Sequence, residues 1–280
     1  MFADLHIHSW YSDGTLNPEE IVKKAKAQDI TLISICDHNL IDAYSELPDL
    51  CAENHIKFIV GVEINAVMND MEYHILAYGF DTKNKAINEL LRYNRDVYAD
   101  RANKLIEKIS KDYPAVSIEE FLKYERNRKN GGWESIDYLN SKGLLINGIK
   151  DYFDFMRKYG SLPDKDFLTP EEVIKIIHEA GGYAVLAHIG EYIEQNITDC
   201  EKTAAQFFEM GIDGFECYYP HHTVETTEFL TKFCRERDLI ITVGGDEHGE
   251  FADLNSRGNY IGAVKIKIEQ LNLKNMIRKE

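Results

Sequence analysis

Short runs of apolar residues recur in the first and last parts of the chain, each five to seven residues long. Runs of this length, rich in β-branched and aromatic residues, are typical of buried β-strands, because helices are usually longer than ten residues. The pattern predicts strands at residues 3–7, 31–36, 58–62, 73–79, 183–187, 214–218, 239–243 and 260–266.

Between these runs, apolar residues are spaced as on one side of a helix. Asn17 followed by Pro18, Glu19 and Glu20 is typical of a helix start, with a capping side chain, proline in the first turn and early acidic residues. The pattern predicts helices at residues 19–28, 41–54, 171–180, 201–210 and 226–237. This alternation predicts an α/β fold, and seven or eight strands favour a parallel barrel over an open sheet, although the sequence leaves its closure open.

The middle of the chain has a different pattern. Leu90, Leu91, Val97, Leu105 and Ile106 follow helical spacing with charged residues between them, and breaks are expected at residues 130–132 and 160–163. We therefore expect a mostly helical insertion at residues 84–165, lying over the functional site that is predicted below. Residues 1–83 and 166–280 would together form the β/α barrel.

Charge narrows the range of partners. The chain has 280 residues and a net charge of −16, which argues against tight binding along an extended nucleic-acid duplex. Residues 81–170 carry 17 basic and 15 acidic side chains, whereas the rest carries 15 and 33. The middle segment is thus the part with basic surface to offer an anion.

Location can also be predicted. No apolar run approaches the ~20 residues that span a bilayer, and the first residues lack the pattern of a signal peptide. The five cysteines are odd in number and form no Cys-x-x-Cys pair. These features predict a cytoplasmic protein without a membrane partner.

Metal-ligand residue types gather where the predicted strands end. His6 and His8 project from one face of the first strand, with Cα atoms ~6.5 Å apart. His74 lies on a predicted strand. The residues that fall just after predicted strands are Asp13, His38, Glu63, His188, His222, Asp246 and His248. In a β/α barrel these ends form one face, where active sites are built.

Six histidines and three carboxylates suit Zn²⁺, Mn²⁺ or Fe²⁺ better than Ca²⁺, which prefers oxygen ligands. At three or four ligands per ion, with Glu63 able to bridge, nine groups can hold two or three ions. Clustered ions polarise phosphoryl oxygens and activate water, so no separate nucleophile is needed, and the common Ser-nucleophile and phosphate-loop motifs are absent from the sequence. Metal-assisted hydrolysis is the leading interpretation.

The order of these motifs resembles the PHP (polymerase and histidinol phosphatase) superfamily. The resemblance covers nearly all of the chain except the middle and rests on D-L-H-I-H-S, S-D-G-T, C-D-H-N, G-V-E-I, Y-H-I-L-A-Y-G-F, L-A-H-I-G and G-G-D-E-H-G. It implies a distorted barrel of seven β/α units with a trinuclear metal centre. The implied ligand sets are His6, His8, Glu63 and Asp246 for one ion; Glu63, His74 and His188 for a second; and Asp13, His38 and His248 for a third.

Within that superfamily the layout is most similar to nucleoside 3′,5′-bisphosphate phosphatases and 5′-to-3′ exoribonucleases. This similarity implies that His222 contacts the substrate phosphate, but Tyr219 replaces a histidine of the same run. Residues 132–138 also lack the arginines and histidine of a G-R-P-H-I-A-R-like segment, which puts recognition of a second phosphate in doubt. Arg101 is our candidate substitute, since arginine can bind phosphate with two hydrogen bonds.

The sequence therefore predicts a metal-dependent phosphoesterase that hydrolyses a phosphomonoester with metal-activated water. The expected substrates are small nucleotides or the 5′ ends of short oligonucleotides. A phosphatase for another metabolite, such as histidinol phosphate, and a non-catalytic metal-binding module are the alternatives. The oligomeric state is not predicted.

Overall fold

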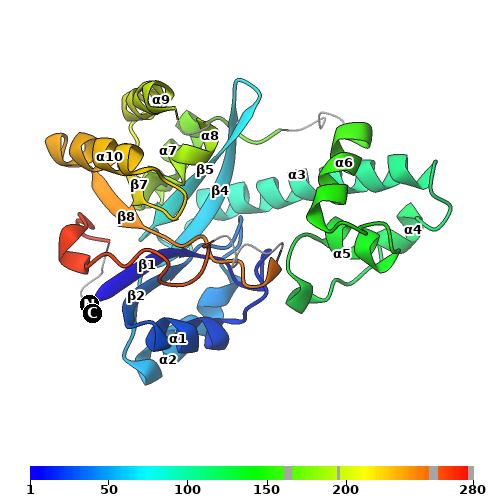
Figure 1. Ribbon diagram of the computed structural model, residues 1–280, viewed down its shortest axis with the longest axis horizontal. Helices are drawn as coiled ribbons and strands as arrows, with labels where there is room; N and C mark the ends of the chain where they lie inside the picture. Colours follow the sequence, from blue (N-terminus) through cyan, green and yellow to red (C-terminus); the bar gives the residue numbers. More distant parts are fainter. Residues whose placement is uncertain (161–165, 194–195, 252–257, 277–280) are drawn as a thin grey trace.

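The computed structural model describes residues 1–160, 166–193, 196–251 and 258–276 as a mixed α/β fold (Figure 1). One sheet has three parallel strands in the order β1, β2, β3, and the other has five strands in the order β4 to β8. The strands are β1 (Phe2–Ile7), β2 (Ile30–Ile35), β3 (Lys57–Phe58), β4 (Gly61–Met68), β5 (Met71–Tyr78), β6 (Tyr183–Leu186), β7 (Gly214–Tyr218) and β8 (Ile240–Val243).

The two sheets meet through isolated parallel bridges between Ile7 and Glu247 and between His38 and Glu63. The strands are not all parallel, because β4 and β5 form a hairpin and β6 runs antiparallel to β5. The α/β prediction is confirmed. A closed barrel of seven β/α units stays a prediction.

The strand predicted at residues 260–266 is wrong, because these residues form turns and irregular backbone. Two of their backbone N–H groups donate to side chains instead of to a neighbouring strand. The Ile261 N–H donates to Glu247 Oε2 at 2.9 Å, and the Gly262 N–H donates to Asp4 Oδ2 at 2.8 Å. Gly262 also has a φ of +75°, which breaks an extended strand.

Helices cover the sheets largely where the pattern predicts them: α1 (Pro18–Ala27), α7 (Pro170–Glu179), α9 (Ile197–Glu209) and α10 (Val224–Glu236). Asn17 and Glu20 cap α1 reciprocally, as expected from the sequence. The single helix predicted at residues 41–54 is wrong. It is divided into a 3₁₀ turn (Asp42–Ser45) and α2 (Leu47–Asn54), because Pro48 lacks an N–H and suits a helix start. A short helix not predicted, α8 (Ile189–Tyr192), follows β6.

The chain between β5 and α7 is mostly helical, as expected, and contains α3 (Lys85–Ser110), α4 (Ile118–Phe121), α5 (Glu134–Ser141) and α6 (Ile149–Tyr159). Helix α3 runs from the sheets into a lobe formed with α4, α5 and α6 (Figure 1). Leu90 of α3 packs in the core around β4 and β5, whereas Ile106 packs in the core of the lobe. The break in the helices expected at residues 130–132 is present. The break expected at residues 160–163 falls mostly outside the residues that the structure describes, which omit 161–165.

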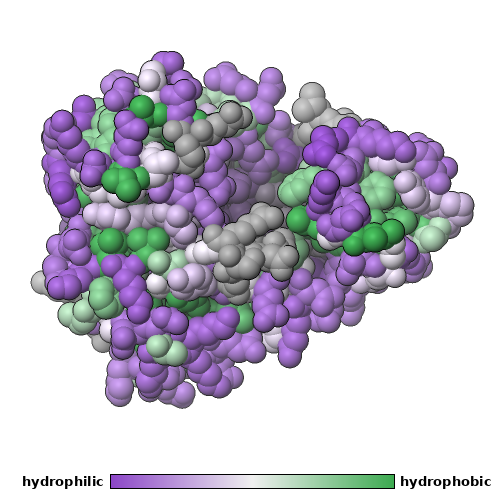
Figure 2. Space-filling view, viewed as in Figure 1, coloured by the Kyte–Doolittle hydropathy of each residue, from purple (hydrophilic) through white to green (hydrophobic). Residues whose placement is uncertain are grey.

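A hollow with largely hydrophilic walls lies between the lobe and the rest of the molecule, and apolar residues gather on the face of the lobe that is turned to the viewer (Figure 2). The exposed apolar side chains of this lobe include Ile146 and Phe153. No helix within the described ranges is both long and apolar enough to cross a membrane.

Candidate metal centre

Strands β1, β4 and β5 carry four of the candidate ligands or lead into them. His6 lies on β1 and His8 directly follows it, and both side chains are fully buried with their Nε2 atoms 3.1 Å apart. Glu63 and His74 lie within β4 and β5. The expectation that Glu63 follows a strand is wrong, because the predicted strand is divided between β3 and β4, and Glu63 is the third residue of β4.

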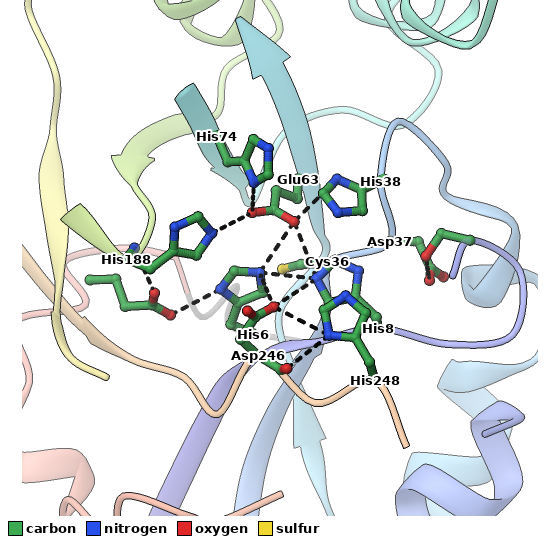
Figure 3. A network of polar contacts seen from close by, with 12 residues as sticks. His6, His8, Cys36, Asp37, His38, Glu63, His74, His188, Asp246 and His248 are labelled. Carbon is green, nitrogen blue, oxygen red and sulfur yellow. Dashed lines mark hydrogen bonds and ion pairs between the residues drawn. The ribbon is translucent and has the colours of Figure 1, made fainter. Parts of the chain in front are cut away.

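Glu63 lies at the middle of the cluster (Figure 3). Its side chain is 1% exposed, and its two oxygens face histidine rings on several sides. Oε1 lies 3.0 Å from His74 Nδ1 and 3.1 Å from His188 Nε2, and Oε2 lies 3.2 Å from His8 Nε2, 3.3 Å from His38 Nδ1 and 3.4 Å from His6 Nε2. One carboxylate can therefore serve more than one cation.

Two further carboxylates extend the cluster from loops. Asp13 Oδ2 lies 3.3 Å from His248 Nε2 and 3.8 Å from His38 Nε2, and Oδ1 lies 3.3 Å from His8 Nδ1. Asp246 Oδ1 lies 3.2 Å from His8 Nε2. The structure thus brings all nine predicted ligand residues into one cluster, in which all but His74 and Asp246 are buried.

The cluster fits divalent cations. Three groups place their ligand atoms within 4.8 Å of one another: His8, Asp13, His38 and His248; His6, His8 and Glu63; and His38, Glu63 and His74. Several buried atoms of the cluster have no hydrogen-bond partner: Nδ1 of His8, His38, His74 and His188, and Oε2 of Glu63. Unpaired buried polar atoms are costly, and coordination of a cation removes that cost.

Electrostatics keep the carboxylates charged. Burial opposes ionisation of Glu63, but His38, His6 and His74 outweigh it and hold the pKa of Glu63 well below its usual value. Burial also disfavours the charged form of His74, yet Glu63 and Glu72 raise its pKa to about 10. Burial dominates at His38 and lowers its pKa to about 4. Anionic carboxylates beside imidazoles are the donor set that borderline divalent ions prefer.

Sequence reasoning missed Glu216, which lies in the middle of β7. Its Oε1 accepts a hydrogen bond from His6 Nδ1 at 3.1 Å, and its Oε2 accepts from the His188 N–H at 2.9 Å. The bond to Nδ1 leaves His6 Nε2 facing the cluster, as carboxylates behind metal-binding histidines commonly do. A charged residue inside the apolar strand G-F-E-C-Y was the available signal.

Two aspartates beside the ligands support backbone. Asp4 accepts from the backbone of Gly245 and Gly262, and burial raises its pKa to about 7. Asp37 accepts from the Ser9 N–H at 2.7 Å and from the hydroxyls of Ser9 and Ser12. Through these contacts both aspartates fix loops beside the cluster.

The predicted substrate contacts have other partners here. His222 Nδ1 donates to the Cys217 carbonyl, and its Nε2 accepts from the Gly190 N–H, so both ring nitrogens are engaged. Burial lowers the pKa of His222. Arg101 forms ion pairs with Glu72 at 3.0 Å and Asp166 at 2.7 Å. Substrate binding by His222 and Arg101 stays a prediction.

Tyr219, which stands where relatives were expected to carry histidine, lies at the edge of the cluster. Its hydroxyl donates to Glu191 Oε1 at 2.5 Å and lies 3.4 Å from Asp246 Oδ2. The side chain is buried, and its ring centroid is 5.6 Å from that of His188.

Comparisons with known proteins agree with this geometry. A 5′-3′ exoribonuclease of Haemophilus influenzae is 28% identical over 252 residues, which cover 88% of this chain and 89% of that protein. A 3′,5′-nucleoside bisphosphate phosphatase of Chromobacterium violaceum is 26% identical, with coverage of 88% and 86%. A solved structure from Bifidobacterium adolescentis, described as a metal-dependent phosphoesterase, has a TM-score of 0.80 and 25% identity and covers 96% of this chain and 93% of its own.

The PHP domain family matches residues 4–217, a span that includes seven of the nine clustered ligand residues. Asp246 and His248 lie beyond that span, yet their side chains complete the same cluster. The chain therefore belongs to the PHP domain family, and it is a metal-dependent phosphoesterase.

Proposed function

We propose that the chain hydrolyses a phosphomonoester on a small nucleotide, or on the 5′ end of a short oligonucleotide. The buried cluster around Glu63 carries this proposal, because it gathers six imidazoles and three carboxylates with unpaired ligand atoms. The names of the relatives from Haemophilus influenzae and Chromobacterium violaceum support a substrate of this class.

Two or three divalent ions are proposed, drawn from Mn²⁺, Zn²⁺ and Fe²⁺. The ligand sets would be His6, His8, Glu63 and Asp246; Glu63, His74 and His188; and Asp13, His38 and His248. When bound, such ions polarise a phosphoryl oxygen and lower the pKa of water toward ~7. The protein's part is to keep Glu63 ionised between the first two sets and to aim the imidazoles inward.

The arrangement around this cluster supports two further proposals. Residues 1–83 and 166–280 would form a distorted barrel of seven β/α units, and residues 84–165 would form an insertion over the site. The cytoplasm is the proposed compartment, since all five cysteines are free thiols in the structure.

The experiment compares substrates that differ in the number and position of their phosphate groups. Arg101 and His222 are the proposed contacts, and residues 132–138 bring neither arginine nor histidine. The purified protein would be assayed for phosphate release with Mn²⁺, Zn²⁺, Fe²⁺ or Mg²⁺. The panel contains 3′,5′-bisphosphates, mononucleotides, 5′-phosphorylated short RNA and histidinol phosphate.

Preference for the bisphosphate or the short RNA is the expected result. Turnover of histidinol phosphate alone would overturn the nucleotide proposal while retaining the metal centre. Absence of phosphate release with every metal would favour the non-catalytic alternative.

A further inference from the structure

The backbone that presents Asp13 contains a cluster of carbonyl groups. This Asp13 loop, residues 9–14, turns sharply after β1, with the N–H groups of Ser12 and Gly14 both donating to the Ser9 carbonyl. The carbonyls of Trp10, Tyr11 and Ser12 then converge on one point. Three carbonyl oxygens that point to one place need a group with several N–H donors, because carbonyls without hydrogen-bond partners are costly to bury.

Arg126, from the chain between α4 and α5, supplies that donor. Its Nη2 donates to the carbonyls of Trp10 at 3.0 Å, Tyr11 at 3.3 Å and Ser12. The side chain is 8% exposed. A planar guanidinium is well suited to this task, because its donors point outward in a fixed fork.

Arg126 also holds the other side of the Asp13 loop, through Gly132. Arg126 Nη1 donates to the Gly132 carbonyl at 2.7 Å, and the Gly132 N–H donates to the Asp13 carbonyl at 2.7 Å. Gly132 has a φ of +68°, and a Cβ there would lie 2.6 Å from the ring of Phe251. Arg126 and Gly132 therefore hold the backbone immediately before and at Asp13.

We infer that Arg126 is a positioning residue that holds Asp13 for the ion of the Asp13, His38 and His248 set. This inference rests on the proposed metal centre. The segment between α4 and α5 thus contributes to metal binding although none of its side chains is a proposed ligand. Glu63 and His74, by contrast, lie within the paired strands β4 and β5.

The test compares Arg126→Gln with a matched control, Arg128→Gln. Arg128 lies two residues away, and its guanidinium packs over the Tyr11 ring at 5.1 Å, so the control removes the same charge beside the same loop. Metal-free protein would be titrated with Mn²⁺, and bound ions per chain would be counted by elemental analysis. Melting temperatures would be measured with and without Mn²⁺.

Arg126→Gln should bind about one ion fewer than wild type or bind it at least ~10-fold more weakly, since removal of a group that orients a ligand typically weakens metal affinity 10–100-fold. Arg128→Gln should match wild type. Arg126→Lys keeps the charge but loses the fork, so we expect it to fold and to show an intermediate affinity.

A wild-type Mn²⁺ titration for both Arg126→Gln and Arg126→Lys would overturn the inference, even if the metal-free protein melted at a lower temperature, because that pattern is purely structural. Equal weakening by Arg128→Gln would also overturn it, since the effect would then follow charge rather than the carbonyl contacts. Failure of wild type to bind Mn²⁺, Zn²⁺ or Fe²⁺ would instead contradict the proposed function.

Discussion

Two halves of the candidate metal centre use the same kinds of side chain on different supports. Glu63 and His74 lie within paired strands, where Glu63 is opposite Leu76 and His74 is opposite Asn65. Asp13 lies on a turn, and the other two residues of its proposed ligand set, His38 and His248, also lie outside the strands. Paired strands carry Glu63 and His74, whereas Asp13 depends on a turn that Arg126 and Gly132 hold by hydrogen bonds. Substitutions far from the centre should therefore disturb the loop half first.

Glu63→Gln should have the largest effect, because Glu63 belongs to both strand-side ligand sets. We expect kcat/KM to fall ~10³-fold or more, since metal ions supply several kcal/mol of transition-state stabilisation and each ~1.4 kcal/mol is tenfold. Metal content should fall by more than one ion per chain. Kinetic assays and elemental analysis measure these two quantities, and circular dichroism checks that the variant keeps its fold. A variant with full metal content would contradict the central role of Glu63.

Asp13→Asn should affect the loop half alone. The amide keeps the shape but offers a weaker ligand to the ion proposed between Asp13, His38 and His248. We expect ~10²-fold lower kcat, corresponding to about 2.7 kcal/mol, and loss of one ion. Retention of the ions around Glu63 would show that the halves load separately. Loss of every ion would show that the two halves form one cooperative site.

The sequence predicts the ligands of both halves better than their supports. Spacing placed His6 and His8 on one face, and strand ends gathered Asp13, His38 and His248, because both follow from local periodicity. Neither Glu216 nor Arg126 could be assigned in this way. Glu216 and its partner His6 are 210 residues apart in the sequence, and Arg126 and its partner Ser12 are 114 residues apart. The tertiary fold decides which residues pair over such separations.

The errors have the same origin. Residues 260–266 have the apolar pattern of a strand, yet Asp4 and Glu247 capture the backbone N–H groups of Ile261 and Gly262. The single strand predicted around residues 58–62 became parts of two sheets, which moved Glu63 into a strand. Hydrophobic periodicity reports burial, and it does not report which partner satisfies the backbone.

Glu216→Gln sharpens the comparison, because Glu216 supports the strand half from behind as Arg126 supports the Asp13 loop. The amide can still accept from His6 Nδ1 or from the His188 N–H, but without charge. We expect metal affinity to fall ~10-fold, the lower end of what such orienting partners contribute. Glu209→Gln, on the exposed end of α9, is the control. An unchanged Mn²⁺ titration would limit Glu216 to a structural role.

Arg101→Lys should have the smallest effect, and it tests the proposed substrate contact. Two of its guanidinium nitrogens are paired with Glu72 and Asp166, while Nε is buried without a hydrogen-bond partner. Lysine keeps the positive charge but offers a single nitrogen, so it cannot reproduce both ion pairs and a phosphate contact. We expect KM to rise about threefold with kcat unchanged, a loss of under 1 kcal/mol of uniform binding. Steady-state kinetics on the preferred substrate measures both constants.

An unchanged KM would assign Arg101 to holding Glu72 and Asp166 together. A fall in kcat alone would place Arg101 with the metal centre rather than with the substrate, because uniform binding affects KM and not turnover.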